Sequence, residues 1–247
     1  MTATPAWPPA SLPRLYVDLS LAIGVAVLLD GAAANYLGNV MRLKPGGQVR
    51  LFDDVTGEWL AEAIDVGKRR IQLSVTAQIG PREAVPDLWL CAAPLKKGRI
   101  DWMVEKACEL GVACVVPVVT RRAVVDRPKS ERLRAHMIEA AEQCGRTAIP
   151  RLAETVKLPA LLRDWPAGRT LFFADETGGV PAFAAMREGS ATAAILIGPE
   201  GGFDDEERAA IRAHPDAVGI SLGPRILRAD TAAAAAVSLW MAAQGDW

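Results

Sequence analysis

The sequence predicts an α/β protein with a small β-rich N-terminal domain and a larger C-terminal domain built on a parallel sheet. Short β-type runs separated by turns fill the first part of the chain. From Leu88, short and fully apolar runs alternate with helical segments, which is typical of a parallel sheet covered by helices on both faces. The chain has 247 residues, 51% of them hydrophobic, and a net charge of -1, which favours a folded globular protein.

The N-terminal domain is expected over residues 14–76, as a small β-barrel. The runs VRLFDD, GEWLAEAIDV and RRIQLSV predict strands, and GAAANYLGNVMRL predicts a short helix between turns. Residues 1–13 are rich in proline and predict a disordered tail. Residues 77–87, with two prolines and mixed charge, predict a linker.

The C-terminal domain is expected over residues 88–247. Its predicted strands are LWLCAAP, VACVVPVV, TLFFA, AAILIG and AVGISLG. Gly145 follows a helical segment and is expected to end it in the left-handed conformation. Asp204 and Glu207 form the pattern of a capping box at the start of another helix. The last helix is rich in alanine, and we expect Ala233 and Ala236 to let a second subunit approach closely.

Two glycine-rich loops follow buried strands and precede helices. The first is IGPEGGF, and the second is SLGPRILRAD. Asp204 to Glu207 would repel a phosphate at the first loop, and no Lys-Ser or Lys-Thr pair follows its glycines, so it is not a P-loop. On neighbouring strands, the two loops would share one pocket at the carboxyl edge of the sheet. Gly201 and Gly223 are expected to need a positive φ or close approach. The alternative is two ordinary turns.

The composition provides few residues that could bind a metal or act as a catalytic histidine. The chain has two histidines and four cysteines without a Cys-x-x-Cys pair, so we predict no metal site. No signal-peptide pattern or membrane-length apolar run is present, and a cytoplasmic location is expected. Residues 96–151 contain 12 Lys and Arg against 7 Asp and Glu. This excess predicts either a solvated basic face or a surface for a polyanion.

Five motifs, in this order, resemble those of the 16S ribosomal RNA uracil-N3 methyltransferases of the SPOUT superfamily. They are KKGRIDWMVEKACELGV, PVVTRRAVV, EAAEQCGRTAIP, IGPEGGF and SLGPRILRADTA. The segment NYLGNVMRLKPGGQVRLFD is similar to the family's PUA-like RNA-binding barrel, so the resemblance covers nearly the whole chain. The chain departs from many relatives at Ala229 and Asp230, which replace Thr and Glu, and at Asn35 and Tyr36, which replace two histidines.

The resemblance implies a function and an assembly. The chain would use S-adenosylmethionine to methylate N3 of a specific uridine in the 16S rRNA of the small ribosomal subunit. It would be a homodimer without a membrane or metal partner, and its C-terminal domain would carry a deep trefoil knot whose loops bind the cofactor. The alternatives are a related knotted methyltransferase acting on another RNA or ring atom, and a non-catalytic RNA-binding protein.

Site residues follow from the two loops and the resemblance. Glu200 is the first candidate to contact the base or accept its proton, with a structural turn residue as the alternative. Arg228 would stabilise charge on the uracil oxygens, or else form an interface salt bridge, and Asp230 would be a second catalytic carboxylate or a plain helix N-cap. The RNA-binding candidates are Arg14, Arg42, Lys44, Arg121, Arg122 and Arg146. The cofactor-binding candidates are Ile197, Gly198, Pro199, Glu200, Gly201, Gly202, Ser221, Leu222, Gly223, Ile226 and Leu227.

Overall fold

The computed structural model describes residues 12–126 and 128–247. The chain divides into two compact units at the peptide between Glu83 and Ala84. The predicted tail at residues 1–13 lies almost wholly outside the described residues. No helix in the described ranges is long and apolar enough to cross a membrane.

The N-terminal unit is a five-stranded sheet in the order β1-β3-β4-β5-β2. β1 pairs with β3 in parallel, and the remaining pairs are antiparallel. The strands predicted from sequence are confirmed as β3, β4 and β5, and β5 continues to Gly80, into the segment predicted as a linker. The five strands are β1 Arg14–Tyr16, β2 Ala26–Asp30, β3 Gln48–Phe52, β4 Glu58–Val66 and β5 Arg70–Gly80.

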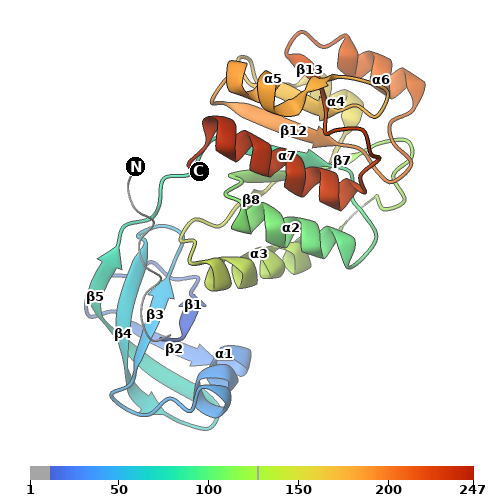
Figure 1. Cartoon of the computed structure of the whole chain (residues 1–247). Coiled ribbons are helices and arrows are strands. Elements are labelled where there is room, and N and C mark those ends of the chain that lie inside the picture. The colour runs from blue at the N-terminus through green and yellow to red at the C-terminus, as the bar shows by residue number, and fades with distance from the viewer. Residues whose placement is uncertain (1–11, 127) are drawn as a thin grey trace. The chain divides into compact units, whose positions relative to one another are not determined.

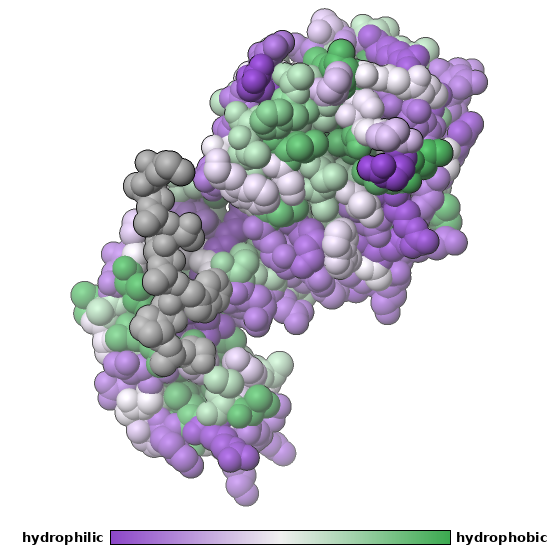
Figure 2. Space-filling model, in the orientation of Figure 1, coloured by the Kyte–Doolittle hydropathy of each residue, from purple (hydrophilic) through white to green (hydrophobic). Residues whose placement is uncertain are grey.

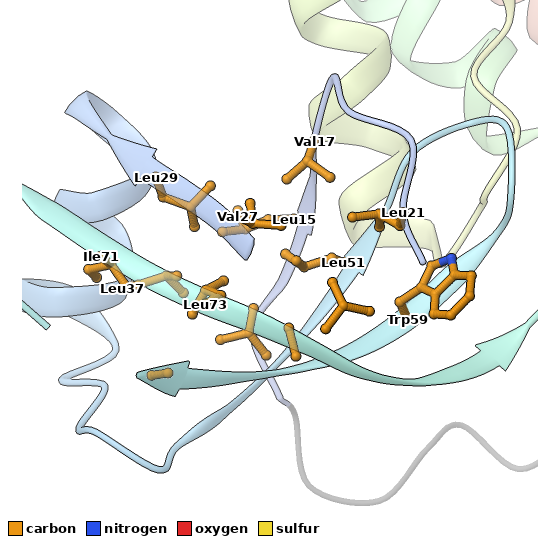
Figure 3. Close-up of a cluster of buried hydrophobic side chains, with 14 of the residues drawn as sticks. Leu15, Val17, Leu21, Val27, Leu29, Leu37, Leu51, Trp59, Ile71 and Leu73 are labelled. Carbon is orange, nitrogen blue, oxygen red and sulfur yellow. The ribbon is translucent and has the colours of Figure 1, made fainter. Parts of the chain in front are cut away.

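The predicted helix of this unit is confirmed, in two pieces. α1 Gly31–Asn35 runs directly into the π-helical turn η1 Tyr36–Val40. Figure 3 shows how the strands and this helical segment turn apolar side chains toward one another. Leu37 of η1 is fully buried among strand residues that include Leu51 and Ile71. Alternation along each strand therefore gives this unit a core of its own.

The C-terminal unit is an eight-stranded sheet in which all strand pairs among the described residues are parallel. The order is β11-β13-β10-β12-β6-β7-β8, with β9 paired to β7. All five strands predicted in this half of the sequence are confirmed; four of them are largely buried runs, and in β13 Ile220 is the buried residue. The strands are β6 Leu88–Ala92, β7 Cys114–Val119, β8 Arg151–Leu152, β9 Val156–Lys157, β10 Thr170–Ala174, β11 Val180–Pro181, β12 Ala193–Ile197 and β13 Ala217–Ser221.

Helices cover both faces of this sheet (Figure 1). One face shares a core with α4 and α6, and the other is covered by α7 together with α2 and α5. Gly145 ends α3 with φ 85°, and Asp204 and Glu207 form the predicted capping box, so both expectations are confirmed. The helices are α2 Arg99–Glu109, α3 Ser130–Cys144, α4 Leu158–Arg163, α5 Ala182–Glu188, α6 Asp205–Arg212 and α7 Ala229–Gln244.

The choice of Ala233 and Ala236 as contacts to a second subunit is wrong. Their side chains are 1% and 0% exposed, because this stripe of α7 packs inside its own unit beside Trp240. The small side chains allow α7 to approach the chain's own sheet closely. Its more accessible stripe contains Ala235, Leu239 and Ala242 instead.

Asp53 organises the turn between β3 and β4. Its Oδ1 accepts the backbone N–H groups of Val55, Thr56 and Gly57, at 2.9, 2.7 and 3.3 Å. Its Oδ2 accepts the N–H of Leu21 at 2.7 Å and the Thr56 hydroxyl at 2.6 Å. Burial alone would raise the pKa of Asp53, but these hydrogen bonds outweigh it and hold the pKa below its ordinary value.

Replacing Asp53 with Asn is expected to destabilise the N-terminal unit by about 1–3 kcal/mol, because an amide leaves buried N–H groups unpaired. Hydrogen exchange of β3 and β4 amides at neutral pH measures the loss. The stability that the Asp53 carboxylate contributes is fully present above its unfolded pKa of about 3.9. It is lost as the pH falls through the lower pKa of the folded state. Asp65→Asn, at an exposed position of β4, is the control for removing one charge. Equal protection in both variants would contradict the assignment.

Candidate functional site

A pocket of ≈ 460 Å³ lies at the carboxyl edge of the parallel sheet. Three loops form most of its wall, and they follow β10, β12 and β13. The prediction that the two glycine loops follow neighbouring strands is wrong, because β10 pairs with both β12 and β13 and separates them. The loops still converge, since parallel strands end at one edge and β10 adds a loop of its own.

The loop after β12 is a tight turn held by glycines. Gly202 has φ +66°, and its N–H donates to the carbonyl of Pro199 at 2.9 Å. A Cβ on Gly202 would clash with the Glu176 carboxylate, whereas one on Gly201 would meet only the Arg122 side chain at 3.5 Å. The requirement for positive φ predicted for Gly201 therefore belongs to Gly202, and Gly201 does not line the pocket.

Arg121 and Arg122 brace this loop from the end of β7. Arg122 Nη1 donates to the carbonyl of Gly201 at 2.8 Å. Arg121 Nη1 lies 3.0 Å from Asp204 Oδ2 and 2.5 Å from Glu206 Oε2. The N–H of Glu207 and the Arg121 guanidinium together hold the pKa of Asp204 below its ordinary value. Both arginines thus brace the loop, and the positive charge of Arg121 is already matched by two acids.

The loop after β13 supplies apolar wall and free cations. Gly223 has φ +105°, as predicted, with open space around it. Leu222 and Leu227 are half-buried in the wall, and Ile226 is 92% exposed. Arg225 and Arg228 also line the pocket, and neither has an ion pair among the described residues.

The involvement of the loop after β10 in the site was not predicted from the sequence. This loop carries two acids, Asp175 and Glu176. Asp175 is buried, and its carboxylate accepts hydrogen bonds from Thr177 and from Arg212. Burial would raise the pKa of Asp175, but these partners hold it below the ordinary value. The neighbouring Glu176 lies 2.8 Å from Arg208 Nη2 of α6, and the same nitrogen donates to the carbonyl of Phe203 at 3.3 Å. Arg208 therefore ties the loops after β10 and β12 together.

Two of the three catalytic candidates line the pocket, and the third does not. Glu200 and Arg228 both line the pocket, on different loops. Asp230 does not; it lies in the first turn of α7, where its Oδ1 accepts the N–H of Thr231 at 2.9 Å. Arg228, not Asp230, is the N-cap residue of α7, so the N-cap alternative for Asp230 is wrong.

Two of the predicted RNA-binding arginines are buried and structural. Arg14 is 7% exposed, with its Nε 2.6 Å from Glu58 Oε1 and its guanidinium 4.0 Å from the ring centre of Phe52. Arg146 is 6% exposed and donates to the carbonyls of Cys108 and Val112. Neither is a surface cation for phosphate, which corrects both predictions.

Arg42 and Lys44 of the N-terminal unit are exposed. Among the residues that the structure describes, no group of three or more His, Cys, Asp or Glu side chains could hold a metal.

Comparison with known proteins shows the family to which this chain belongs. The RNA methyltransferase domain family matches residues 81–241, and the RNA methyltransferase PUA domain family matches residues 29–76. The chain is thus an RNA methyltransferase with an attached PUA domain. It belongs to the family of the ribosomal RNA small subunit methyltransferases E, which confirms the resemblance seen in its motifs.

Relatives resemble the chain over almost its whole length. The ribosomal RNA small subunit methyltransferase E of Bacillus subtilis is 30% identical over 85% of this chain and 87% of its own, and that of Rickettsia conorii is 28% identical over 91% and 93%. A putative methyltransferase from Legionella pneumophila, solved with bound S-adenosylmethionine, has a TM-score of 0.84 at 30% identity over 95% of this chain and 98% of its own. The Neisseria gonorrhoeae methyltransferase E, bound to the same compound, has a TM-score of 0.84 at 26% identity over 94% and 98%.

Proposed function

We propose that this chain transfers a methyl group from S-adenosylmethionine to N3 of a specific uridine in the 16S rRNA of the small ribosomal subunit. The observation that carries the proposal is the pocket at the carboxyl edge of the sheet, where three loops present backbone groups, apolar walls and both a free cation and a carboxylate. The structures of similar proteins with bound S-adenosylmethionine support the choice of cofactor.

The lining of the pocket fits the adenosine part of S-adenosylmethionine. Ile220, Leu222 and Leu227 offer apolar contacts for a flat ring, and backbone groups of the two glycine loops offer its polar edge partners. Asp175 and Glu176 add carboxylates to the third loop, but Arg212 and Arg208 pair with them. Arg225 and Arg228 also line the wall, so the lining carries charges of both signs.

Methylation at N3 requires removal of a ring proton and alignment of the nitrogen with the methyl group. Bound S-adenosylmethionine supplies an electrophilic methyl on a sulfonium centre. In this proposal Glu200 accepts the N3 proton, directly or through a water, and Arg228 stabilises negative charge on the neighbouring uracil oxygens. Arg228 is available for this because no carboxylate pairs with it among the described residues.

The N-terminal unit is proposed to dock the RNA. Its PUA family match and the exposed Arg42 and Lys44 support this role. Duplex RNA hides the Watson–Crick edge that carries N3, so the target uridine must be unpaired or turned out of its helix. A folded ribosomal subunit can present such a nucleotide, and we propose the assembled subunit as the substrate.

The active protein is proposed to be a homodimer whose C-terminal unit carries a deep trefoil knot. Figure 2 shows apolar side chains gathered over α5 and α7. Phe183 of α5 is 45% exposed, and Ala235 and Leu239 lie on the accessible stripe of α7. An apolar surface of this kind favours association with a second subunit. The site would then be completed at the boundary between the subunits.

Mass mapping of 16S rRNA tests the proposed function. Ribosomal RNA from cells lacking the protein should lose one methyl group on one uridine, and purified protein with S-adenosylmethionine should restore it on isolated small subunits. Loss of a methyl group at another ring atom or in another RNA would replace the uracil-N3 proposal with the related methyltransferase activity. An unchanged methylation pattern would reject both.

Gly202→Val is expected to abolish binding of S-adenosylmethionine in calorimetry. The branched side chain cannot easily adopt φ +66°, and its Cβ would displace Glu176 from the pocket wall. Gly201→Ala is the matched control, because that position has ordinary φ and room for a methyl group. Wild-type affinity in Gly202→Val would contradict the position of the cofactor.

Arg228→Ala is expected to lower kcat by about 10²–10³-fold while leaving cofactor affinity close to wild type, because it removes one donor to the developing oxyanion. Glu200→Gln retains the side-chain shape but cannot accept a proton. Its defect should therefore shrink as the pH rises and N3 ionises without help. The same fractional activity of Glu200→Gln at every pH would leave Glu200 only a structural role.

Ala235→Arg is expected to give monomers in sedimentation and to reduce activity, because an interfacial charge would lack a partner. Ala209→Arg, at an exposed position of α6, should remain dimeric. A monomeric wild-type protein with full activity would contradict the dimer.

A further inference from the structure

Arg99 enters the pocket from outside the three loops that form it. β6 pairs with β12 in register, so Ala92 lies opposite Ile197, and the Ala93 N–H donates to the Ile197 carbonyl at 3.0 Å. The segments that follow these two strands consequently run side by side. They bring Arg99 Nη1 to 3.6 Å from Glu200 Oε1, and both residues line the pocket.

We infer that Arg99 is the positioning residue that holds the Glu200 carboxylate toward the substrate, an inference that rests on the proposed function of Glu200. Glu200 lies in a turn between Pro199 and Gly201, where the backbone provides little to restrain a long side chain. Its carboxylate has no second ion pair and no side-chain hydrogen bond among the residues that the structure describes. Arg99 is therefore the charged group that, among the described residues, pairs with this carboxylate and gives it a direction.

Arg99 is itself anchored through the start of α2. It is the first residue of that helix, directly after Gly98, which has φ +91°. The Asp101 Oδ2 accepts the Gly98 N–H at 3.1 Å and so fixes the helix start.

The second oxygen of Asp101 faces α3. It lies 3.2 Å from Arg132 Nη2 and 3.7 Å from His136 Nε2, and Asp101 is only 8% exposed. Figure 1 shows α2 and α3 packed side by side. The packed pair of helices thus fixes the position of Arg99 beside the glycine loop after β12.

The ion pair between Arg99 and Glu200 orients the Glu200 carboxylate and adds little to the stability of the fold. Both side chains are about one-third exposed, at 38% and 32%, and they make contact without a short hydrogen bond. Ion pairs of this kind contribute little to the free energy of unfolding. Removing Arg99 should for this reason change the rate of methyl transfer while the melting temperature stays the same.

The full-length protein with small ribosomal subunits provides the test. Arg99→Gln is expected to lower kcat on the order of 10- to 100-fold, because misplacing a reacting group by about 1 Å can cost 10²-fold. Cofactor affinity by calorimetry and the melting temperature should match wild type. Arg99→Lys should recover part of the rate, since a shorter point charge still attracts the carboxylate. Lys106→Gln is the matched control, because Lys106 is on the same helix but pairs with Glu109 at 2.6 Å.

A double-mutant cycle separates positioning from other roles. In a Glu200→Gln background, Arg99→Gln should change kcat by less than about twofold, because the charge that it positions is gone. An equal loss in both backgrounds, full activity of Arg99→Gln, or the same loss in Lys106→Gln would overturn the inference. A higher KM for the subunit with unchanged kcat would also overturn it, by assigning Arg99 to RNA binding. Wild-type protein that transfers no methyl group to uracil would instead reject the proposed function itself.

Discussion

The position of β10 between β12 and β13 is the constraint on which the pocket depends. Three parallel strands that are immediate neighbours must end at one edge, about 4.8 Å apart from strand to strand. The loops that follow them therefore meet whatever their sequences are. The sequences decide what each loop presents to the pocket. The loop after β12 presents glycine backbone, the loop after β13 presents apolar side chains and arginines, and the loop after β10 presents the buried Asp175 and the exposed Glu176.

Ion pairs and hydrogen bonds of arginine side chains hold the converging loops in place. Arg208 and Arg212 of α6 hold the acids after β10, while Arg122 holds the glycine turn after β12 from the far side. The charges of Arg208 and Arg212 are matched by these acids, whereas Arg122 donates to backbone carbonyls. Arg225 and Arg228 also line the pocket, and neither has an ion pair in the part of the chain that the structure describes. The same sequence feature, a basic residue at a strand or helix end, thus serves two different purposes in one site.

Local patterns in the sequence predicted the elements better than their arrangement. The five apolar strands, the Gly145 helix end and the Asp204 capping box each depend on neighbours within a few residues, and all were predicted. Strand order is set by pairing between distant segments, so β10 was not expected between the glycine loops. TLFFADETGG carried a usable signal, a buried strand followed by acids and a glycine pair. Burial of Arg14 and Arg146 arises from tertiary packing, which charge counts along the chain do not reveal.

Hydrogen exchange with and without S-adenosylmethionine tests the central claim most directly, because it reports all three loops at once. If one pocket binds the cofactor, protection should increase together in residues 175–178, 198–203 and 221–228, while the amides of β3 and β4 in the N-terminal unit stay unchanged. Protection confined to one of these loops, or centred on the N-terminal unit, would contradict a shared site formed at the carboxyl edge of the sheet.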